Sequence, residues 1–330
     1  MKITRLAAFC ALFFMSFSLH AQEEPLFYAN DFVNQNEIEV FNKQYSARCQ
    51  AVRIHPNWYL TAAHCVKSLC DGGECFVQIN LVQGNLSARA FVAHTKAKPT
   101  VFAYEGFNLR QNRSSNFDVA LIRYAPYNTE YVNNKTGLEM TRKTFAEAAA
   151  KDTRASAQWQ ATVNPKRVRL LNFSTAESSL LKRVVAVPRI HERGIFFYQS
   201  GGAPVYYVKE LQHLLTANFG VEKGMSGSGV LTNTGELAGV VSSAVRNANG
   251  TASFYDDQGK LVARFDNLNN YFLFAGFNGT TLNFIRNTLA KYGDSMADVG
   301  VVTADGEFAS PAKRSFKQIM RLIDGVEIID

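Results

Sequence analysis

Short apolar segments separated by turn-forming residues make up most of the chain, and they limit what it can fold into. In one segment, Val77, Ile79 and Leu81 alternate with Gln and Asn, which is the pattern of a half-buried strand. Further segments bounded by Gly, Asn, Asp or Pro lie at residues 119–122, 168–173, 184–187, 205–208, 229–231, 237–241 and 271–277. Because many short strands with such turns are typical of sandwiches and barrels, the sequence predicts an all-β fold.

Helices are expected at only three places. Thr144 followed by Glu147 resembles a capping box, which predicts a short helix between two strand-rich halves. A second helix is predicted to start at Thr281 and to end at Gly293, and a third spans residues 310–325. The apolar stripes of these two helices are formed by Leu282, Ile285 and Leu289 and by Phe316, Ile319, Met320 and Ile323.

The N-terminus has the pattern of a secretory signal peptide. Lys2 and Arg5 precede an apolar run over residues 6–17, and cleavage is expected after Ala21 or, alternatively, after Ser18. A membrane anchor is the competing interpretation, but a spanning helix needs about 20 apolar residues and this run is much shorter. The sequence therefore predicts a secreted or periplasmic protein without stable membrane insertion.

The basic charge of the chain falls when the signal is removed. The signal holds two of the 35 Lys and Arg residues and none of the 28 Asp and Glu residues, so the net charge drops from +7 to +5. The remaining basic residues are scattered, without a dense run or an interleaved aromatic motif. We therefore expect no nucleic-acid partner, and the sequence leaves the oligomeric state open.

Four cysteines remain after the signal leaves with Cys10, and an even number in an exported chain indicates disulfides. Three pairings are possible. Cys70 and Cys75 enclose the turn-forming Asp-Gly-Gly-Glu, which favours pairing them with each other and leaves Cys49 with Cys65. The alternative is a four-cysteine zinc site, but the two Cys-x-x-Cys knuckles usual in such sites are missing. No metal and no other cofactor are expected.

Three polar residues lie in contexts that suit nucleophilic catalysis. They are His64 in Leu-Thr-Ala-Ala-His-Cys, Asp118 in Asn-Phe-Asp-Val-Ala-Leu-Ile and Ser226 in Gly-Met-Ser-Gly-Ser-Gly. A serine hydroxyl needs a base to take its proton, histidine has a suitable pKa, and a carboxylate fixes the imidazole tautomer. Each residue alone has an ordinary structural explanation, but the three together predict a catalytic site.

These motifs resemble those of the trypsin-like (chymotrypsin-fold) serine endopeptidases, in particular secreted bacterial members. Thr-Ala-Ala-His-Cys is the most specific match, and residues 237–243 and 281–292 resemble the strand after the nucleophile and the C-terminal helix. The resemblance covers roughly residues 27–292 and is weak between 125 and 215. It implies two antiparallel six-stranded barrels with the catalytic site at their junction, and it implies a Cys49–Cys65 disulfide.

The resemblance also assigns roles. His64 would act as general base and then acid, Asp118 would orient it, and Ser226 would be the nucleophile. The N–H groups of Gly224 and Ser226 would form the oxyanion hole. Ser242 matches the serine that lies near the buried aspartate and helps to hold the substrate backbone.

Two features depart from the family pattern. Met225 replaces an aspartate that, in many relatives, pairs with an N-terminus freed by zymogen cleavage. No Arg-Ile-Val-Gly-Gly-like activation site occurs ahead of Cys49 either. Because both absences agree, we predict that this activation switch is missing.

The specificity pocket is expected to lack an acidic residue. By alignment from the nucleophile, Gly220 takes the position where an aspartate would select Arg or Lys, and Ser243 and Ala244 lie along the pocket wall. Trypsin-like specificity is therefore disfavoured, and a neutral or apolar residue is expected before the scissile bond. Attraction of an acidic residue by Lys223 or Arg246 is the alternative.

The predicted organisation has four parts: a signal peptide over 1–21, a first barrel over 22–135, a second barrel with the C-terminal helix over 136–292, and an extension over 293–330. The helix predicted in the extension is expected to dock on the barrels rather than on a membrane or a partner. The predicted function is an exported serine endopeptidase acting on proteins or peptides. A catalytically inactive homologue used for binding is the alternative.

Overall fold

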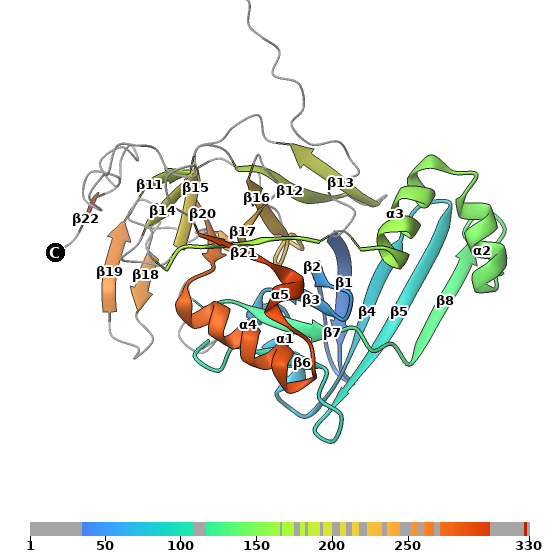
Figure 1. Ribbon diagram of the computed structural model, residues 1–330, viewed down its shortest axis with the longest axis horizontal. Helices are drawn as coiled ribbons and strands as arrows, with labels where there is room; N and C mark the ends of the chain where they lie inside the picture. Colours follow the sequence, from blue (N-terminus) through green and yellow to red (C-terminus); the bar gives the residue numbers. More distant parts are fainter. Residues whose placement is uncertain are drawn as a thin grey trace, which may run out of the picture.

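The structure is a computed structural model with a mainly β fold (Figure 1). It describes residues 35–107, 117–165, 167–174, 179–181, 184–191, 194–199, 205–208, 213–217, 223–232, 236–244, 252–255, 261–266, 271–303 and 327–328. The predicted signal peptide and the helix predicted over 310–325 lie outside these ranges. Within them, no helix has both the length and the apolar character needed to cross a membrane.

The first half of the chain forms one antiparallel sheet, called sheet A, in the order β6-β7-β3-β2-β1-β4-β5-β8-β9. Its strands are β1 (Gln35–Phe41), β2 (Ser46–His55), β3 (Trp58–Thr61), β4 (Glu74–Val82), β5 (Leu86–Thr95), β6 (Val101–Ala103), β7 (Ala120–Arg123), β8 (Asn128–Asn133) and β9 (Leu138–Glu139). Strand β4 contains the alternating segment recognised in the sequence, and Val77 and Ile79 are fully buried while Phe76 is exposed. The half-buried strand predicted there is confirmed.

Two helices pack against the β8 end of sheet A, α2 (Arg142–Ala149) and α3 (Thr153–Val163) (Figure 1). The rings of Tyr131, Phe145 and Trp159 contact one another at centroid distances of 5.1–5.9 Å, and they join the core inside the sheet. Helix α2 begins after Thr141, whose side chain forms a capping box with Thr144. The prediction of a short helix is confirmed, but its predicted box of Thr144 with Glu147 was wrong by one turn.

The second half forms a ten-stranded sheet, and eight of its strands follow the order β11-β14-β15-β20-β17-β16-β12-β13. They are β11 (Ser179–Leu181), β12 (Val184–His191), β13 (Gly194–Gln199), β14 (Val205–Val208), β15 (His213–Ala217), β16 (Gly229–Thr232), β17 (Leu237–Ala244) and β20 (Tyr271–Gly276). Strands β10 (Leu170–Asn172) and β21 (Val301–Thr303) pair in parallel, and β10 also pairs with β17. A separate sheet contains β18 (Ala252–Tyr255), β19 (Leu261–Asp266) and β22 (Glu327–Ile328).

The prediction of two closed six-stranded barrels is not confirmed. Among the described strands, neither large sheet closes on itself, since β6 and β9 end sheet A and β11 and β13 end the main path of the second sheet. The core of sheet A is filled partly by helices α2 and α3, since Phe145 and Ala149 of α2 are fully buried and Trp159 of α3 is buried beside them. Helices thus supply apolar surface that a closed ring of strands would supply otherwise.

A shared core joins the two halves. Trp58 and Leu121 of sheet A belong to the same buried cluster as Val240 of β17 and Ile285 of helix α4 (Gly279–Lys291). The predicted C-terminal helix is confirmed, but its N-cap is Asn278 rather than Thr281. Asn278 accepts hydrogen bonds from the N–H groups that open the helix, and Thr281 completes the capping box from position N3. Residues adjoining this shared core carry the candidate site.

The chain continues past α4 along the surface of both halves. Asp294 accepts a hydrogen bond from the indole N–H of Trp58 at 2.7 Å and from the amide of Asn57 at 3.0 Å. Helix α5 (Met296–Val299) and strand β21 follow, and β21 extends the second sheet. Docking of residues 294–303 is therefore seen, whereas the helix predicted beyond 310 is outside the described residues.

Both predicted disulfides are confirmed, Cys49–Cys65 and Cys70–Cys75, and they exclude the four-cysteine zinc alternative. We expect loss of Cys49–Cys65, through Ser at both positions, to lower the free energy of unfolding more than loss of Cys70–Cys75. The chain-entropy model gives about 3 kcal/mol for the 16-residue loop and about 2 kcal/mol for the 5-residue loop. Urea unfolding of the two double variants measures the difference, and the opposite order would contradict the prediction.

Candidate functional site

His64 and Asp118 meet where sheet A adjoins the second half of the chain. His64 is the second residue of helix α1 (Ala63–Cys70), directly after β3, and Asp118 precedes β7, the neighbour of β3 in the sheet. The carboxylate of Asp118 accepts two hydrogen bonds from the histidine, from its backbone N–H at 2.8 Å and from ring atom Nδ1 at 2.7 Å. This pair fixes the imidazole, with its Nε2 free of the carboxylate.

A third side chain completes the environment of the carboxylate. The hydroxyl of Ser242, on β17, donates a hydrogen bond to Asp118 Oδ2 at 2.6 Å. Asp118 and Ser242 are both buried, with 2% and 4% exposure. An ionised carboxylate in such a site needs donors to replace water, and it has three of them here. The contact that the resemblance implied for Ser242 is present.

These contacts perturb the pKa values of both partners. Burial lowers the pKa of His64, but the charge of Asp118 and the hydrogen bond to it outweigh burial, so the pKa lies above its usual value. Burial raises the pKa of Asp118, but the charge of His64 and the hydrogen bonds from His64 and Ser242 outweigh it and hold that pKa below its usual range. The pair therefore favours an ionised aspartate facing a readily protonated imidazole.

Ser226 lies in a tight turn between Gly224 and β16. Its carbonyl oxygen accepts a hydrogen bond from the backbone N–H of Gln50 at 2.7 Å. Gln50 directly follows Cys49, and the Cys49–Cys65 disulfide joins that strand to the residue after His64. The chain segments that carry the predicted nucleophile and the predicted base are thus held together by a hydrogen bond and a disulfide.

Glycine is required in this turn for two reasons. Gly227 has φ +81°, and a Cβ there would lie 2.2 Å from the Gln50 carbonyl oxygen and 2.3 Å from Thr61 Oγ1. Gly224 has φ +95°, a conformation that side-chain-bearing residues rarely adopt. The Gly-rich sequence around Ser226 is explained by these positions, because any side chain at Gly227 would push the turn away from β2.

Within the described residues, the Ser226 hydroxyl and the His64 ring do not form a hydrogen bond with each other. His64 Nε2 instead lies 3.8 Å from Cys65 Sγ. Catalytic hydrogen bonds are often long in unliganded enzymes and tighten when substrate binds. The N–H groups of Gly224 and Ser226 donate to no partner within the described ranges, so both stay available.

The predicted specificity pocket is described only in part. Gly220 lies outside the described residues. Ser243 and Ala244 extend β17, where they pair with Leu273 and Phe272 of β20. The backbone therefore places both residues on the strand that carries Ser242, while the pocket wall itself stays a prediction.

Cys49, His64 and Cys65 bring three potential metal-ligand atoms within 4.8 Å of one another. The two sulfur atoms are bonded to each other, however, so neither is a thiolate. This group is therefore no metal site. The Cys49–Cys65 disulfide instead lies against the ring of His64.

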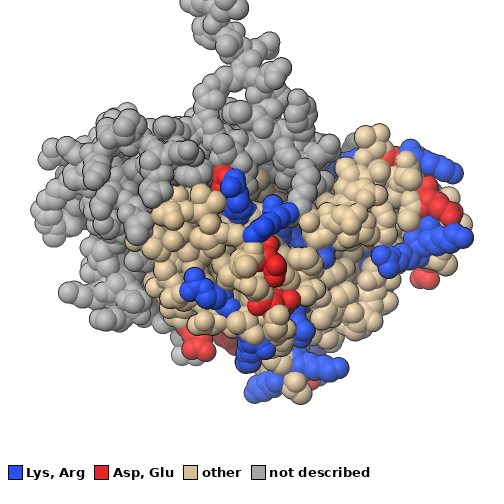
Figure 2. Space-filling view, viewed as in Figure 1, with Lys and Arg blue, Asp and Glu red and all other residues tan. Residues whose placement is uncertain are grey.

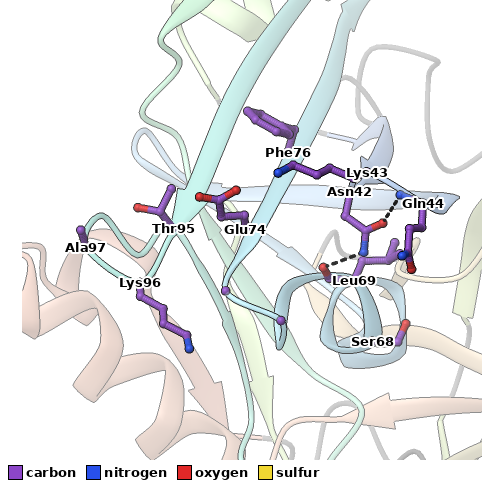
Figure 3. Close-up of a pocket in the computed structure, with 12 residues that line it drawn as sticks. Asn42, Lys43, Gln44, Ser68, Leu69, Glu74, Phe76, Thr95, Lys96 and Ala97 are labelled. Carbon is purple, nitrogen blue, oxygen red and sulfur yellow. Dashed lines mark hydrogen bonds between the residues drawn. The ribbon is translucent and has the colours of Figure 1, made fainter.

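A surface hollow of about 730 Å³ lies at the other end of α1 (Figure 3). Asn42 lines it, and its side chain accepts a hydrogen bond from the N–H of Gln44 at 2.9 Å and donates one to the Leu69 carbonyl at 3.2 Å. Lys43 and Lys96 also line it. None of the predicted site residues does, so this hollow is separate from the candidate catalytic centre.

Among the described residues on the face shown in Figure 2, basic and acidic side chains are interspersed, without a single large patch of one sign. The scattered charge expected from the sequence is seen on this face. The expectation that the protein has no nucleic-acid partner stays a prediction.

The family follows from a comparison with protein-family models. The model described as Trypsin matches residues 30–259, which is more than half of the chain and includes all three predicted catalytic residues. The chain belongs to the trypsin family of serine endopeptidases. The family identified from the sequence motifs is thereby confirmed, and with it the expectation that the substrates are proteins or peptides.

Several solved structures match the chain at low sequence identity. HL collagenase is 15% identical with a TM-score of 0.41, over 80% of this chain and 96% of that one. Glu endopeptidase in complex with MPD is 16% identical with a TM-score of 0.38, over 77% and 90%. Protease Anisep from Arthrobacter nicotinovorans is 10% identical with a TM-score of 0.44, over 78% and 95%. The comparison with curated proteins gave no match.

Two residues of the site were missed in the sequence, Gln35 and Gln50. Both are buried, and both contact the backbone of the segment around Ser226. The partners lie 174 and 194 residues away in the chain, and no local pattern signals such contacts.

Proposed function

We propose that this protein is an exported serine endopeptidase that cleaves peptide bonds through an acyl-enzyme. Ser226 Oγ attacks the scissile carbonyl and passes its proton to His64 Nε2, while the Asp118 carboxylate stabilises the resulting imidazolium. The N–H groups of Gly224 and Ser226 stabilise the negative charge that develops on the carbonyl oxygen. The protonated histidine then gives its proton to the leaving amine, and water activated by the same histidine releases the acid product.

The observation that carries this proposal is the hydrogen-bonded series from Ser242 through Asp118 to His64 in a chain of the trypsin family. A binding protein would gain nothing from a buried carboxylate held by three donors against a histidine ring. The alternative of an inactive homologue therefore has no observation in its favour.

Export rests on the signal-like N-terminus and is supported by the two disulfides, which persist in oxidising compartments. Cleavage after Ala21 or Ser18 is tested by N-terminal sequencing of protein recovered outside the cytoplasm. The docked extension after 293 belongs to the same proposal. The boundary predicted between residues 135 and 136 falls inside sheet A, because β8 and β9 pair across it.

The enzyme is expected to cleave after neutral or apolar residues. An acid at the position of Gly220 would select basic side chains, and none is present there. Peptide substrates that differ only in the residue before the scissile bond measure this preference as kcat/KM. Fast cleavage after Arg would refute the proposed specificity, and fast cleavage after Glu would favour attraction by Lys223 or Arg246.

The catalytic proposal itself is tested with a serine-directed phosphonate. The unmodified protein should hydrolyse casein or small esters, and the phosphonate should stop that hydrolysis. Peptide mapping by mass spectrometry should locate the adduct on Ser226. Absence of both turnover and labelling, or labelling at another serine, would refute the proposed nucleophile.

A further inference from the structure

The segment from Gly224 to Gly229 needs support that the usual activation switch does not give. Met225 lies where many relatives have an aspartate, and its side chain is buried, with 1% exposure. A buried thioether cannot form an ion pair with a newly freed N-terminal ammonium group. Some other group must therefore hold the backbone that carries the proposed nucleophile and oxyanion hole.

Gln50 contacts both residues proposed to form the oxyanion hole. Its backbone N–H donates to the Ser226 carbonyl at 2.7 Å, and its side-chain Nε2 donates to the Gly224 carbonyl at 3.4 Å. Gln50 is itself fully buried, and its own carbonyl accepts a hydrogen bond from the Thr61 hydroxyl at 2.6 Å. Gln50 is thus a buried residue of β2 that holds the turn by donating hydrogen bonds to two of the turn's carbonyl groups.

Gln35 holds the other end of the segment. Its side-chain Oε1 accepts from the backbone N–H of Gly229 at 2.9 Å, and its Nε2 donates to the carbonyl of the same residue at 3.4 Å. One buried amide therefore satisfies both backbone groups of Gly229, as a neighbouring strand would. Two glutamines of the first half thereby anchor the two ends of the nucleophile segment.

The need for such anchors follows from the glycines. Gly224 has φ +95°, and peptide groups next to glycine rotate at little steric cost. A rotation there would turn a carbonyl oxygen toward the place where the oxyanion forms. With the Gly224 and Ser226 carbonyls both held by Gln50, their N–H groups remain without a partner among the described residues and available to substrate.

We propose that Gln50 and Gln35 are positioning residues that keep residues 224–229 in the catalytic conformation without a cleaved N-terminus. The proposal rests on the proposed peptidase function. It states that the enzyme is competent as soon as it folds, because the support comes from two side chains of the first half rather than from a charge released by proteolysis.

The main test is Gln50→Met, which removes the side-chain donor at similar volume and keeps the backbone N–H bond to Ser226. Misplacement of reacting groups by about 1 Å can cost about 100-fold in rate, so we expect kcat to fall about 10- to 100-fold with KM within about threefold. Gln35→Met should also lower kcat. A kcat within about twofold of the unmodified enzyme for Gln50→Met would overturn the proposal.

A second variant, Gln50→Glu, tests the hydrogen bond within one folded protein. A protonated carboxyl group can donate to the Gly224 carbonyl, whereas an ionised one repels it. Burial disfavours ionisation, so the ratio of the variant's kcat to that of the unmodified enzyme should be highest in acid and fall as the pH rises. Protonation of His64 affects both enzymes and cancels in this ratio. A ratio that does not change with pH would overturn the proposal even if Gln50→Met failed to fold.

The control is Gln78→Met on β4, a half-buried glutamine whose amide, within the described part of the chain, bonds only to the side chain of Asn80. It should leave kcat and KM unchanged. Phosphonate labelling of the unmodified enzyme is measured first, because a failure there refutes the peptidase function itself. Normal labelling combined with an unaffected Gln50→Met variant refutes only the positioning role.

Discussion

Replacing Ser226 with Ala should abolish peptide hydrolysis, with a fall in kcat of about a million-fold when residues of a catalytic triad act as one unit. The substitution removes the only oxygen that forms the acyl-enzyme and leaves the backbone bond from Gln50 to the Ser226 carbonyl in place. The fold should therefore persist. Hydrolysis of casein and of a small ester, together with the melting temperature, measures both expectations.

Non-additivity gives the sharper form of this prediction. If Ser226 and His64 act in one step, His64→Ala should cost about as much as Ser226→Ala, and the double variant should be no slower than either. If the two residues contributed independently, the fold-losses in kcat of the single variants would multiply in the double variant. A double variant that is much slower than both single variants would contradict the shared step.

Ser228 offers a matched control two residues along the same turn. Its hydroxyl is buried and has no hydrogen-bond partner within the described residues, and its backbone bonds to Met225 and Val241 do not depend on the side chain. Ser228→Ala should therefore keep full activity. Equal losses from Ser226→Ala and Ser228→Ala would mean that the turn, rather than the nucleophile, had been disturbed.

The sequence was informative wherever a local pattern has one structural meaning. Alternation in residues 77–81 identified a strand, and the turn between Cys70 and Cys75 identified a disulfide. The motif around His64 identified the family. Each of these signals lies within a few residues of the feature it predicts, so no knowledge of distant contacts was needed.

The errors and omissions have two physical causes, an ambiguous local pattern in one case and partners far away in the chain in the others. The box at Thr141 was assigned three residues too late because Thr144, at N3, was taken as the cap. Helix α3 was not predicted because its buried face is set by packing against Tyr131 and Phe145. The open course of sheet A has the same origin, since those helices provide apolar surface beside its strands.

The contacts of Gln50 and Gln35 show the same limit inside the site. A triad can be recognised from three short motifs, but the supports of the nucleophile turn join residues more than 170 positions apart. Their side chains resemble any polar residue in a strand until the fold brings the second half against β1 and β2. Sequence motifs thus located the reacting groups, and the structure located the groups that hold them.

Asp118→Asn should lower kcat about 10 000-fold, the effect of giving a triad histidine the wrong tautomer. The carboxylate accepts the Nδ1 proton of His64, which leaves Nε2 with a lone pair for the serine proton. An amide NH₂ facing Nδ1 would donate instead and move the ring proton to Nε2. The amide oxygen can still accept the backbone N–H of His64, so the fold should survive.

The pH profile separates this explanation from a general loss of structure. Protonated His64 cannot accept the serine proton, so kcat/KM should fall as the pH drops through the pKa of His64, which Asp118 holds above the usual histidine value. Without the negative charge of Asp118, burial alone acts on the ring and lowers the pKa of His64. The kcat/KM of Asp118→Asn should therefore begin to fall at a lower pH than that of the unmodified enzyme. Asp298→Asn, an isosteric change at an exposed carboxylate on α5, should move neither the rate nor the limb. An acid limb that stays in place in Asp118→Asn would show that the rate does not depend on the His64–Asp118 pair.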